Sequence, residues 1–405
     1  MSCEKSSVIL DEKTPFHNEY PKKKVCSKSV VSWVLAAFLV ALIVVLTVQF
    51  LYPAVEKRIQ SEIKNFNVYE DNPIEVNLMS QSYPSSKEAS LEKKGTKKTD
   101  EEDKHMPWRR NFLINPVDLC ITRNHPKSEE YLKGPEVKLL MLVSSATGHF
   151  AQRQAIRNTW GSIANSLFGP MRLGFVLGTT SNTTEEQLIL QESQRYKDII
   201  QADFEDTYRN LTTKSIVMLK WVAKYCPHSQ FFLKADDDTF INVGIIARIL
   251  GKEPFASKDK FIGGYVHSGA QPSRDPDEKY YVSEDDYSKE EYPPYASGHA
   301  YITLGSTAAE LFDAAQLVQP LLPMEDVFIT GLCAQEIQAE LIHDPRFRYE
   351  DPPRPPTWSA YSNLASAHSI TPDELEIIWE DMAKTLLDHL YQIDKMLNET
   401  TAQRK

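Results

Sequence analysis

An α/β fold with a mostly parallel central sheet flanked by helices is predicted for the chain after residue 137. Short apolar runs typical of buried strands alternate there with segments whose apolar residues recur at the helical period. One such run, 231–235, ends in the acidic triplet Asp236-Asp237-Asp238. In sheets of this kind ligands bind outside the carboxyl ends of the strands, so the pattern also predicts the edge that binds a ligand.

The expected elements follow one another along the chain. Strands are expected at 137–144, 172–178 and 231–235, and helices at 152–160, 185–196 and 210–226. In the last of these helices Ile216, Leu219 and Ala223 recur on one face. A final helix is expected to begin after Thr371, because the run Thr-Pro-Asp-Glu supplies an N-cap, a proline in the first turn and an acid at the third position. It is expected to end near residue 396.

The segment 30–52 is uncharged and almost wholly apolar, and a bilayer core needs about 20 such residues. Lysines precede it, whereas charges of mixed sign follow it. The positive-inside rule then predicts a cytosolic tail at 1–29, a type II signal anchor at 30–52 and a lumenal remainder; a cleaved signal peptide is the alternative. Residues 53–115 combine mixed charge with little apolar periodicity, which is typical of a flexible stem. The globular domain is therefore expected at 116–405.

Three Asn-x-Ser/Thr acceptor triplets agree with a lumenal body, and they begin at Asn182, Asn210 and Asn398. The formal net charge of −11 argues against a nucleic-acid partner, which would need a basic surface.

Three of the five cysteines would lie in an oxidising lumen, so at most one intramolecular pair can form among them. We favour a Cys120–Cys226 disulfide, which would tie the start of the globular body to the end of a helix. Cys333 is interpreted as a small buried apolar side chain.

The acidic triplet itself indicates a metal–diphosphate site. Adjacent carboxylates repel and raise each other's pKa unless a cation or strong donors lie among them. A hard divalent cation, held by one or two carboxylates and by substrate phosphates, would satisfy them. A nucleotide sugar is the usual cargo of such a site; an acidic surface turn is the alternative interpretation.

Other segments carry chemistry beside the triplet. Arg153 and Arg157 lie four residues apart on one helix face, where they can pair with a diphosphate or hold a carboxylate that shapes the site. Residues 292–301 form an aromatic loop running into a strand, which suits sugar stacking or simple packing. Residues 203–212 are interpreted as a cap and a turn, and the pair Glu325-Asp326 opens a helix.

Together these segments resemble the β-1,3-glycosyltransferases of glycosyltransferase family 31. The blocks occur in order over residues 137–370: RQAIRNTWG, DFEDTYRNLTTKS, a Trp…Cys-Pro helix end, KADDD, YPPYASGHAYI and EDV. The resemblance implies a GT-A-type nucleotide-sugar-binding fold, a single-pass Golgi membrane protein with a lumenal catalytic domain, and sugar transfer from a UDP-sugar donor to an acceptor glycan.

The resemblance also implies a Mn²⁺ cofactor and its ligands. Asp236 and Asp238 would hold the cation and the ribose–diphosphate, with Asp238 the more direct ligand. The histidine ligand of the family matches His368, and His343 is the alternative. The residues that would contact or shape the UDP-sugar site are Arg153, Arg157, Trp160, Lys234, Asp236 and Asp237.

Inverting transfer needs a base that deprotonates a sugar 3-hydroxyl while UDP leaves from the opposite face. Asp326 is expected to be this base, with Glu325 as its orienter or as an acceptor contact. If Asp326 only caps a helix, its loss would reduce stability rather than turnover. Tyr295, Gly298 and His299 are expected at the donor or acceptor sugar. The family commonly has Ser-Gly-Gly-Gly-Tyr here, so the imidazole of His299 leaves the sugar preference open.

Galactose is the expected sugar, because the blocks most resemble the galactose-transferring branch. Transfer of N-acetylglucosamine or N-acetylgalactosamine is the first alternative, and an inactive lectin-like or chaperone subunit is the second. The intact acidic blocks weigh against the second. The expected partners are the donor, an acceptor glycan on a glycoprotein or glycolipid, and the membrane, with a homodimer left open.

Overall fold

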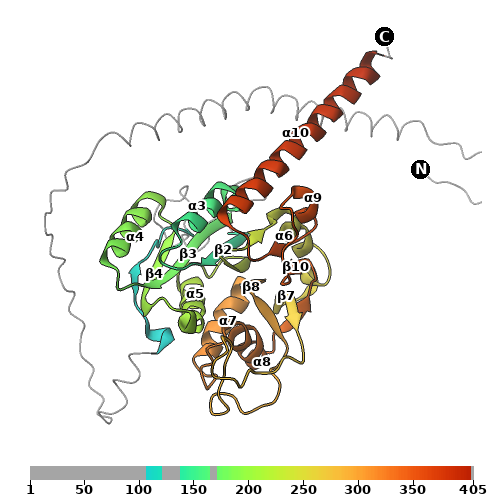
Figure 1. Ribbon diagram of the computed structural model, residues 1–405. Helices are drawn as coiled ribbons and strands as arrows, with labels where there is room; N and C mark the ends of the chain where they lie inside the picture. The colour runs from blue at the N-terminus through green and yellow to red at the C-terminus, as the bar shows by residue number, and fades with distance from the viewer. Residues whose placement is uncertain (1–105, 121–136, 165–170, 403–405) are drawn as a thin grey trace, which may run out of the picture. The chain divides into compact units, whose positions relative to one another are not determined.

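The computed structural model describes residues 106–120, 137–164 and 171–402 (Figure 1). The predicted tail, anchor and most of the predicted stem lie outside the described residues. Within the described ranges, no helix is long and apolar enough to cross a membrane.

The body is built on a mixed sheet of eight strands in the order β1-β4-β3-β2-β5-β8-β7-β9. Their bounds are β1 Phe112–Ile114, β2 Leu139–Ser144, β3 Met171–Thr179, β4 Ile199–Glu205, β5 Phe231–Asp236, β7 Phe261–His267, β8 Tyr295–Leu304 and β9 Glu340–His343. The neighbours β4, β3, β2 and β5 run parallel, whereas β8 is antiparallel to both β5 and β7. The mostly parallel sheet predicted from the sequence is confirmed as a mixed sheet, in which β7 and β9 also pair in parallel and the antiparallel pairs are β1–β4, β5–β8 and β7–β8. β7 and β8 are antiparallel neighbours joined by the loop 268–294 rather than by a crossover helix.

The helices cover both faces of the sheet. They are α3 Phe150–Asn158, α4 Thr183–Tyr196, α5 Leu211–Tyr225, α6 Val243–Leu250, α7 Gly305–Ala315, α8 Ala334–Glu336, α9 Trp358–Tyr361 and α10 Pro372–Ala402. Five shorter segments are 3-10 or π helices: η1 Pro107–Arg109, η3 Trp160–Ile163, η4 Tyr208–Asn210, η5 Phe255–Ser257 and η6 Val327–Cys333. The π-type η6 begins just after the acidic pair at 325–326.

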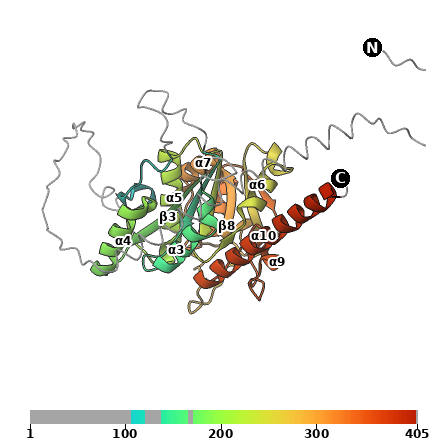
Figure 2. The ribbon, with the colours of Figure 1, turned by 90° about the horizontal axis from the view of Figure 1, so that it is seen from above.

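Strand β2 shows how the sheet separates two apolar cores. Leu139, Met141 and Val143 pack into the core under α3, α6 and α10, while Leu140 and Leu142 pack into the core under α5 and α7. All five side chains are buried, because side chains alternate between the two faces of a strand. Seen from above, α3 and α10 lie on one side of the sheet and α7 lies on the other (Figure 2).

A small second sheet brings the C-terminal part of the chain to the acidic triplet. Its strands are β10 Phe347–Arg348, β11 Ser366–Ala367 and β6 Phe240–Ile241, in the order β10-β11-β6. Since β6 begins two residues after Asp238, the segment that follows β11 passes beside the triplet; the backbone N–H of Ile370 donates to the carbonyl of Asp238 at 2.9 Å.

The body begins earlier than the sequence suggested. Residues 106–115 were assigned to the stem, yet β1 lies in this range and pairs with β4. The indole of Trp221 donates to Asn115 Oδ1 at 2.9 Å, and Lys220 Nζ donates to the carbonyl of Arg110 at 2.7 Å. A three-residue strand in polar surroundings carries no periodic signal, because only its tertiary pairing defines it.

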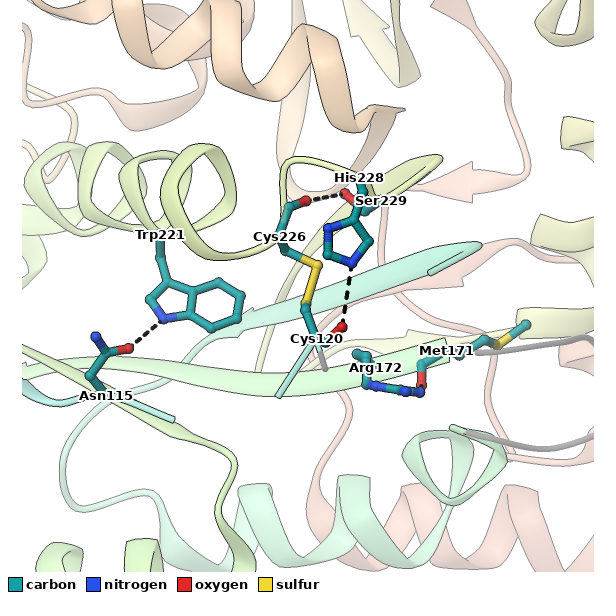
Figure 3. Close-up of a disulfide and its surroundings, with 8 residues drawn as sticks. All are labelled: Asn115, Cys120, Met171, Arg172, Trp221, Cys226, His228 and Ser229. Carbon is teal, nitrogen blue, oxygen red and sulfur yellow. Dashed lines mark hydrogen bonds between the residues drawn. A yellow bond between two sulfur atoms is a disulfide. The ribbon is translucent and has the colours of Figure 1, made fainter. Parts of the chain in front are cut away.

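The predicted disulfide joins this N-terminal segment to the end of α5. Cys120 and Cys226 are bonded across 106 residues of sequence (Figure 3). His228 Nε2 lies 3.3 Å from the carbonyl of Cys120 beside the bond. Cys333 is free and buried, as expected. The favoured pairing is therefore confirmed.

Helix α10 begins where the sequence predicted and ends later. Thr371 Oγ1 accepts from the N–H of Glu374 at 3.3 Å, and the Glu374 carboxylate accepts from the N–H of Thr371 at 2.9 Å, a reciprocal capping box. The first part of α10 packs on the body through Leu375 and Ile378, whereas Leu386 and Leu390 are exposed. The helix extends away from the body in Figure 1 and ends at Ala402 rather than near 396.

Two predicted glycosylation sites have described side chains. Asn182 is exposed and caps α4, accepting from the N–H groups of Thr184 and Glu185. Asn210 is half-buried and its amide donates to the carbonyl of Glu205 at 2.8 Å. Asn398 lies in α10, and its side chain lies outside the description. Glycan attachment at all three stays a prediction.

Candidate active site

The three acids of the triplet have three different environments. Asp236 ends β5, and its Oδ1 accepts from Lys234 Nζ at 2.7 Å. Asp237 is buried, whereas Asp238 is exposed. Asp236 and Asp237 thus have separate hydrogen-bond partners, and Asp238 faces solvent.

A buried lysine links the triplet to the acidic pair. The side chain of Lys234 is 3% exposed; its Nζ lies 3.6 Å from Glu325 Oε2 and also donates to the carbonyl of Gly298. Burial lowers the pKa of Lys234, but the attraction of Asp236 and Glu325 outweighs it, so the pKa lies above its ordinary value. Lys234 is therefore a fixed cation that draws β5, β8 and the acidic pair together.

Asp237 connects the triplet to the loop after β2. Its Oδ2 accepts from Ser145 Oγ at 2.6 Å and from the N–H of Ala146 at 3.3 Å, and it lies 2.9 Å from His149 Nδ1. The hydrogen bond to Asp237 raises the pKa of His149 against the opposing effect of burial. The loop 145–149 is therefore held against the carboxyl end of β5.

Asp238 and the segment after it present the most open acid of the triplet. Thr239 Oγ1 donates to the Asp238 carboxylate at 3.4 Å. Trp160 is buried and its indole donates to the carbonyl of Thr239 at 3.1 Å. This hydrogen bond holds the turn after Asp238 in place. A carboxylate with open oxygens beside a second one suits a hard divalent cation that also binds substrate phosphates.

His368, the predicted histidine ligand, lies near the triplet, but both of its ring nitrogens are hydrogen bonded to other groups. His368 Nδ1 lies 2.8 Å from Ser369 Oγ, and its Nε2 is hydrogen bonded to the carbonyl of Tyr349. Among the residues that the structure describes, no three His, Cys, Asp or Glu side chains form a cluster that could hold a metal ion. The carboxylates thus fit a cation, and ligation by His368 stays a prediction.

The acidic pair lies close against β8 at Gly298. Asp326 Oδ2 accepts from the N–H of Gly298 at 3.3 Å, and its Oδ1 accepts from the N–H of Val327 at 2.9 Å. A Cβ on Gly298 would lie 2.9 Å from Glu325 Oε2 and 3.3 Å from Asp326 Cβ. Glycine therefore lets both carboxylates approach the strand.

Each carboxylate of the pair has a distinct environment. Glu325 is buried, and its Oε1 accepts from Ser215 Oγ at 2.8 Å and from the hydroxyl of Tyr301 at 3.3 Å. Burial and the nearby charge of Glu325 raise the pKa of Asp326 to about 6. A carboxylate with such a pKa is ionised at neutral pH yet is a better proton acceptor than an ordinary aspartate.

The structure corrects the expectation for His299. Its side chain is 7% exposed, with Nε2 at 2.9 Å from Ser366 Oγ and Nδ1 at 3.1 Å from Ser297 Oγ. Burial and the nearby His368 lower the pKa of His299 to about 3, so the ring is neutral. Successive strand residues face opposite sides of the sheet, so His299 joins β8 to β11 while Gly298 faces the acidic pair.

The two predicted arginines bind carboxylates in the interior of the protein. Arg153 is fully buried and binds Glu192 through Nε at 2.9 Å and Nη2 at 2.7 Å, while its Nη1 donates to the carbonyl of Ala146 at 2.7 Å. Arg157 binds Asp198 through Nε at 2.8 Å. Of the two alternatives from the sequence, these contacts favour arginines that hold carboxylates over arginines that bind a diphosphate directly.

Sequence reasoning missed a second buried lysine. Lys214 Nζ donates to the carbonyl of Ser145 and to Asp206 Oδ1, both at 2.7 Å. Asp206 Oδ2 in turn accepts from the N–H of Gly178 at 2.8 Å. Both residues lie in the family block DFEDTYRNLTTKS, of which the first part, 203–212, is interpreted from the sequence as a cap and a turn. An acid before a helix and a lysine on its otherwise apolar face are the signal that could have identified the pair.

Comparisons with known proteins agree with this geometry. Residues 151–345 match the family described as Galactosyltransferase. Beta-1,3-galactosyltransferase 5 of Homo sapiens is 36% identical over 224 residues, covering 54% of this chain and 71% of that protein. Beta-1,3-galactosyltransferase 1 of Mus musculus is 34% identical over 283 residues, covering 68% and 80%. Lactosylceramide 1,3-N-acetyl-beta-D-glucosaminyltransferase of Homo sapiens is 37% identical over 236 residues, covering 56% and 59%.

The fold, the acidic edge of the sheet and these matches define the class of protein, a hexosyltransferase. The chain belongs to the galactosyltransferase family. A crystal structure of a glycosyltransferase involved in the glycosylation of the major capsid of PBCV-1 shows a slighter likeness, with a TM-score of 0.31 and 11% identity over 60% of this chain and 98% of that one. A likeness at that level carries no argument here.

Proposed function

We propose that the protein transfers galactose from a UDP-sugar to the 3-hydroxyl of an acceptor glycan, with inversion, to form a β-1,3 linkage. The observation that carries the proposal is the position of Asp326. It is a carboxylate with a pKa near 6, oriented by two backbone N–H groups and joined through Lys234 and Glu325 to the acidic triplet. A base and a diphosphate-binding edge are the two parts that direct displacement needs.

In this proposal Asp326 accepts the proton of the acceptor hydroxyl as the new bond forms. Its two oxygens each accept one backbone N–H, which fixes the plane of the carboxylate. Glu325 maintains the raised basicity of Asp326 by its charge, and Ser215 and Tyr301 hold Glu325 in place. General-base catalysis of this kind contributes about 10²–10⁴-fold to a rate.

The donor lies at the carboxyl ends of the parallel strands. Asp238 and Asp236 would hold a divalent cation, expected to be Mn²⁺, together with the donor phosphates. When bound, such a cation offsets the charge that develops on departing UDP. Asp237 has a different task, since it holds the loop 145–149 in position.

Galactose is favoured because two of the relatives are named as β-1,3-galactosyltransferases. Transfer of N-acetylglucosamine is the second candidate, because another relative at similar identity is named as an N-acetylglucosaminyltransferase. His299, which left the sugar preference open, is buried and bonded to Ser366, so the donor panel below decides between the two sugars.

The cellular setting is part of the proposal. A type II anchor at 30–52 with a GT-A-type catalytic domain in the Golgi lumen agrees with the disulfide, which forms in oxidising compartments. The stem would then end near residue 105, where the described body begins.

The test uses a secreted form beginning near residue 105, supplied with Mn²⁺ and a panel of UDP-sugars. UDP release is followed with and without β-galactoside and β-N-acetylglucosaminide acceptors, and the product linkage is determined by NMR. Turnover with one donor should be lost with EDTA, and it should fall at least 10²-fold in Asp326→Asn and in Asp238→Ala.

Asp313→Asn, an exposed acid on α7, is the matched control and should keep full activity. Full activity of Asp326→Asn would refute the assignment of the base. UDP binding without Mn²⁺ and without turnover on any acceptor would instead indicate an inactive scaffold.

A further inference from the structure

Five rings form a continuous patch, the aromatic platform, which consists of Tyr265, His267, Tyr295, His343 and Tyr349. The ring centroids of Tyr265 and Tyr349 are 4.1 Å apart, and His267 stacks on Tyr295 at 5.1 Å with planes 28° apart. Tyr265 also contacts His343 at 4.9 Å, and His267 contacts Tyr349 at 4.8 Å. None of the five side chains is buried, so the platform is accessible to a ligand.

The platform lies at the same sheet edge as the acidic triplet, on its antiparallel side. Because Ala300 pairs with Ala235 in an antiparallel ladder, β8 begins at the edge where β5 ends. His267 at the end of β7 pairs with Tyr295 at the start of β8. The loop 145–149 lies on the other side of β5, after β2. The triplet therefore separates the nucleotide edge of the parallel strands from the platform.

Backbone contacts make the platform continuous with the candidate active site. The carbonyl of Tyr349 is hydrogen bonded to His368, two residues before Ile370, which donates to the carbonyl of Asp238. Tyr295 lies three residues before Gly298 on β8 and, besides burial, the charge of Asp326 raises the pKa of its hydroxyl. The platform thus begins within the electrostatic influence of the base.

The chemistry of the rings suits a carbohydrate. Each side chain combines an apolar face with a polar atom, and a pyranose likewise presents a C–H face edged by hydroxyls. His343 Nδ1 accepts from the N–H of Val266 at 3.1 Å, so a neutral ring carries its proton on Nε2, where it can donate to a sugar oxygen. His343 and Tyr349 are exposed and the other three rings are half-buried, with Tyr265 and Tyr295 also packing against the cores, so all five remain partly accessible beside the site.

We propose that the aromatic platform is an acceptor subsite that stacks the sugar next to the one that receives the hexose. The preferred acceptor is then a glycan of at least two sugars rather than a single residue. The inference rests on the proposed transferase function and adds the acceptor class to it. It also gives His343 a role in acceptor binding in place of the metal-ligand role considered for it from the sequence.

The test compares acceptors that share the reactive sugar and differ by one neighbour. For the secreted form, kcat/KM is measured with a disaccharide acceptor and with the methyl glycoside of its terminal sugar. A sugar face packed on one aromatic side chain is expected to contribute about 1.4 kcal/mol, which corresponds to about tenfold. Tyr349→Ala should therefore lower the disaccharide-to-monosaccharide ratio of kcat/KM by about tenfold, through KM.

Two variants distinguish stacking from other effects. Tyr349→Phe keeps the ring and should keep the ratio near the wild-type value, and both substitutions keep the backbone carbonyl that bonds His368. Tyr391→Ala, an exposed tyrosine on α10, is the matched control for loss of a surface ring. An equal loss for both acceptors, an unchanged ratio or a raised KM for the UDP-sugar would overturn the proposal.

A binding measurement distinguishes failure of this inference from failure of the proposed function. Lactose and N-acetyllactosamine are titrated into Asp326→Asn and into Asp326→Asn carrying Tyr349→Ala, with saturation-transfer NMR as the readout. Weaker binding in the double variant, together with no turnover by the wild type, would refute the transferase while supporting the subsite. Turnover by the wild type with equal binding in both variants, or no binding of either disaccharide, would refute the subsite alone.

Discussion

The two halves of the central sheet position their functional groups by different means. On the parallel side, Arg153 binds a buried carboxylate and Lys214 binds another, and both also hold the loop 145–149 through its carbonyls. On the antiparallel side, Arg274 closes the loop 268–294 through backbone carbonyls alone, including that of Val282 at 2.8 Å. Buried charge fixes the geometry of the first side. The second side presents partly exposed rings and the loop 268–294, whose described residues form no buried ion pair, while the buried Lys234–Glu325 pair lies where the two sides meet.

This difference suggests how one scaffold accommodates different acceptors. A diphosphate has constant shape and charge, so a rigid edge held by buried ion pairs suits it. Acceptor glycans vary, and an exposed aromatic surface can change by substitution without unpaired buried charges. We therefore expect substitutions on the parallel side to reduce folding stability and those on the antiparallel side to change substrate use.

The largest effect is expected when a buried ion pair of the parallel side is broken. Arg153→Met removes the bidentate partner of buried Glu192, which then keeps only its ion pair with Arg157, so the expected cost is about 3 kcal/mol in the free energy of unfolding, the lower end for loss of one member of a buried pair. Chemical denaturation measures this cost. Arg195→Ala, an exposed arginine on α4, should change stability by less than about 0.5 kcal/mol. Equal stability of Arg153→Met and the wild type would remove the contrast between the halves.

A smaller effect on stability, with a large effect on turnover, is expected at the glycine beneath the acidic pair. Gly298→Ala forces Glu325 and Asp326 to shift, because the new Cβ would lie 2.9 Å from Glu325 Oε2. A misplaced catalytic group can lose about 10²-fold in kcat. Steady-state kinetics with circular dichroism separates this loss from unfolding.

Gly244→Ala in α6 is the matched control, since its Cβ would meet only Asn242 Oδ1 at 3.4 Å. It should keep full activity and be neutral or slightly stabilising. If both variants kept full activity, the tight approach at Gly298 would have no part in catalysis.

The smallest effect is expected from pH. Because burial and Glu325 raise the pKa of Asp326 to about 6, the base is ionised above pH 6 and protonated below it. The acceptor kcat/KM should therefore fall about tenfold per pH unit below about 6. A raised carboxyl pKa also means that ionised Asp326 opposes folding, so its contribution to stability grows as the pH falls from 6 toward 4. A rate profile flat down to pH 4 would exclude Asp326 as the base.

The parallel side of the fold could be predicted from the sequence, because its strands and helices carry regular apolar periods. The acidic end of β5 likewise predicts a candidate ligand-binding edge. The antiparallel side could not be predicted in the same way: the sequence predicts 292–301 as an aromatic loop running into a strand, yet residues 295–301 already belong to β8. The side of the sheet on which the His299 side chain lies depends on that strand assignment.

The partners of the site were the least predictable part. Glu192 and Arg153 are 39 residues apart in sequence, and Ser215 and Glu325 are 110 apart. Such pairs produce no periodic pattern in the sequence, because only the tertiary fold brings them together. The sequence predicted the candidate acids, whereas the groups that hold them were visible only in the fold.

The bond between Cys120 and Cys226 sets a condition on every preparation of this protein. A disulfide that closes a loop of this length is expected to contribute about 4–5 kcal/mol, a large fraction of the total stability of an ordinary domain. Protein made in a reducing bacterial cytosol, or stored with thiol reagents, would lack that contribution. Inactivity of such a sample would reflect the missing disulfide. A negative transferase assay is therefore informative only after the Cys120–Cys226 bond has been verified by mass spectrometry.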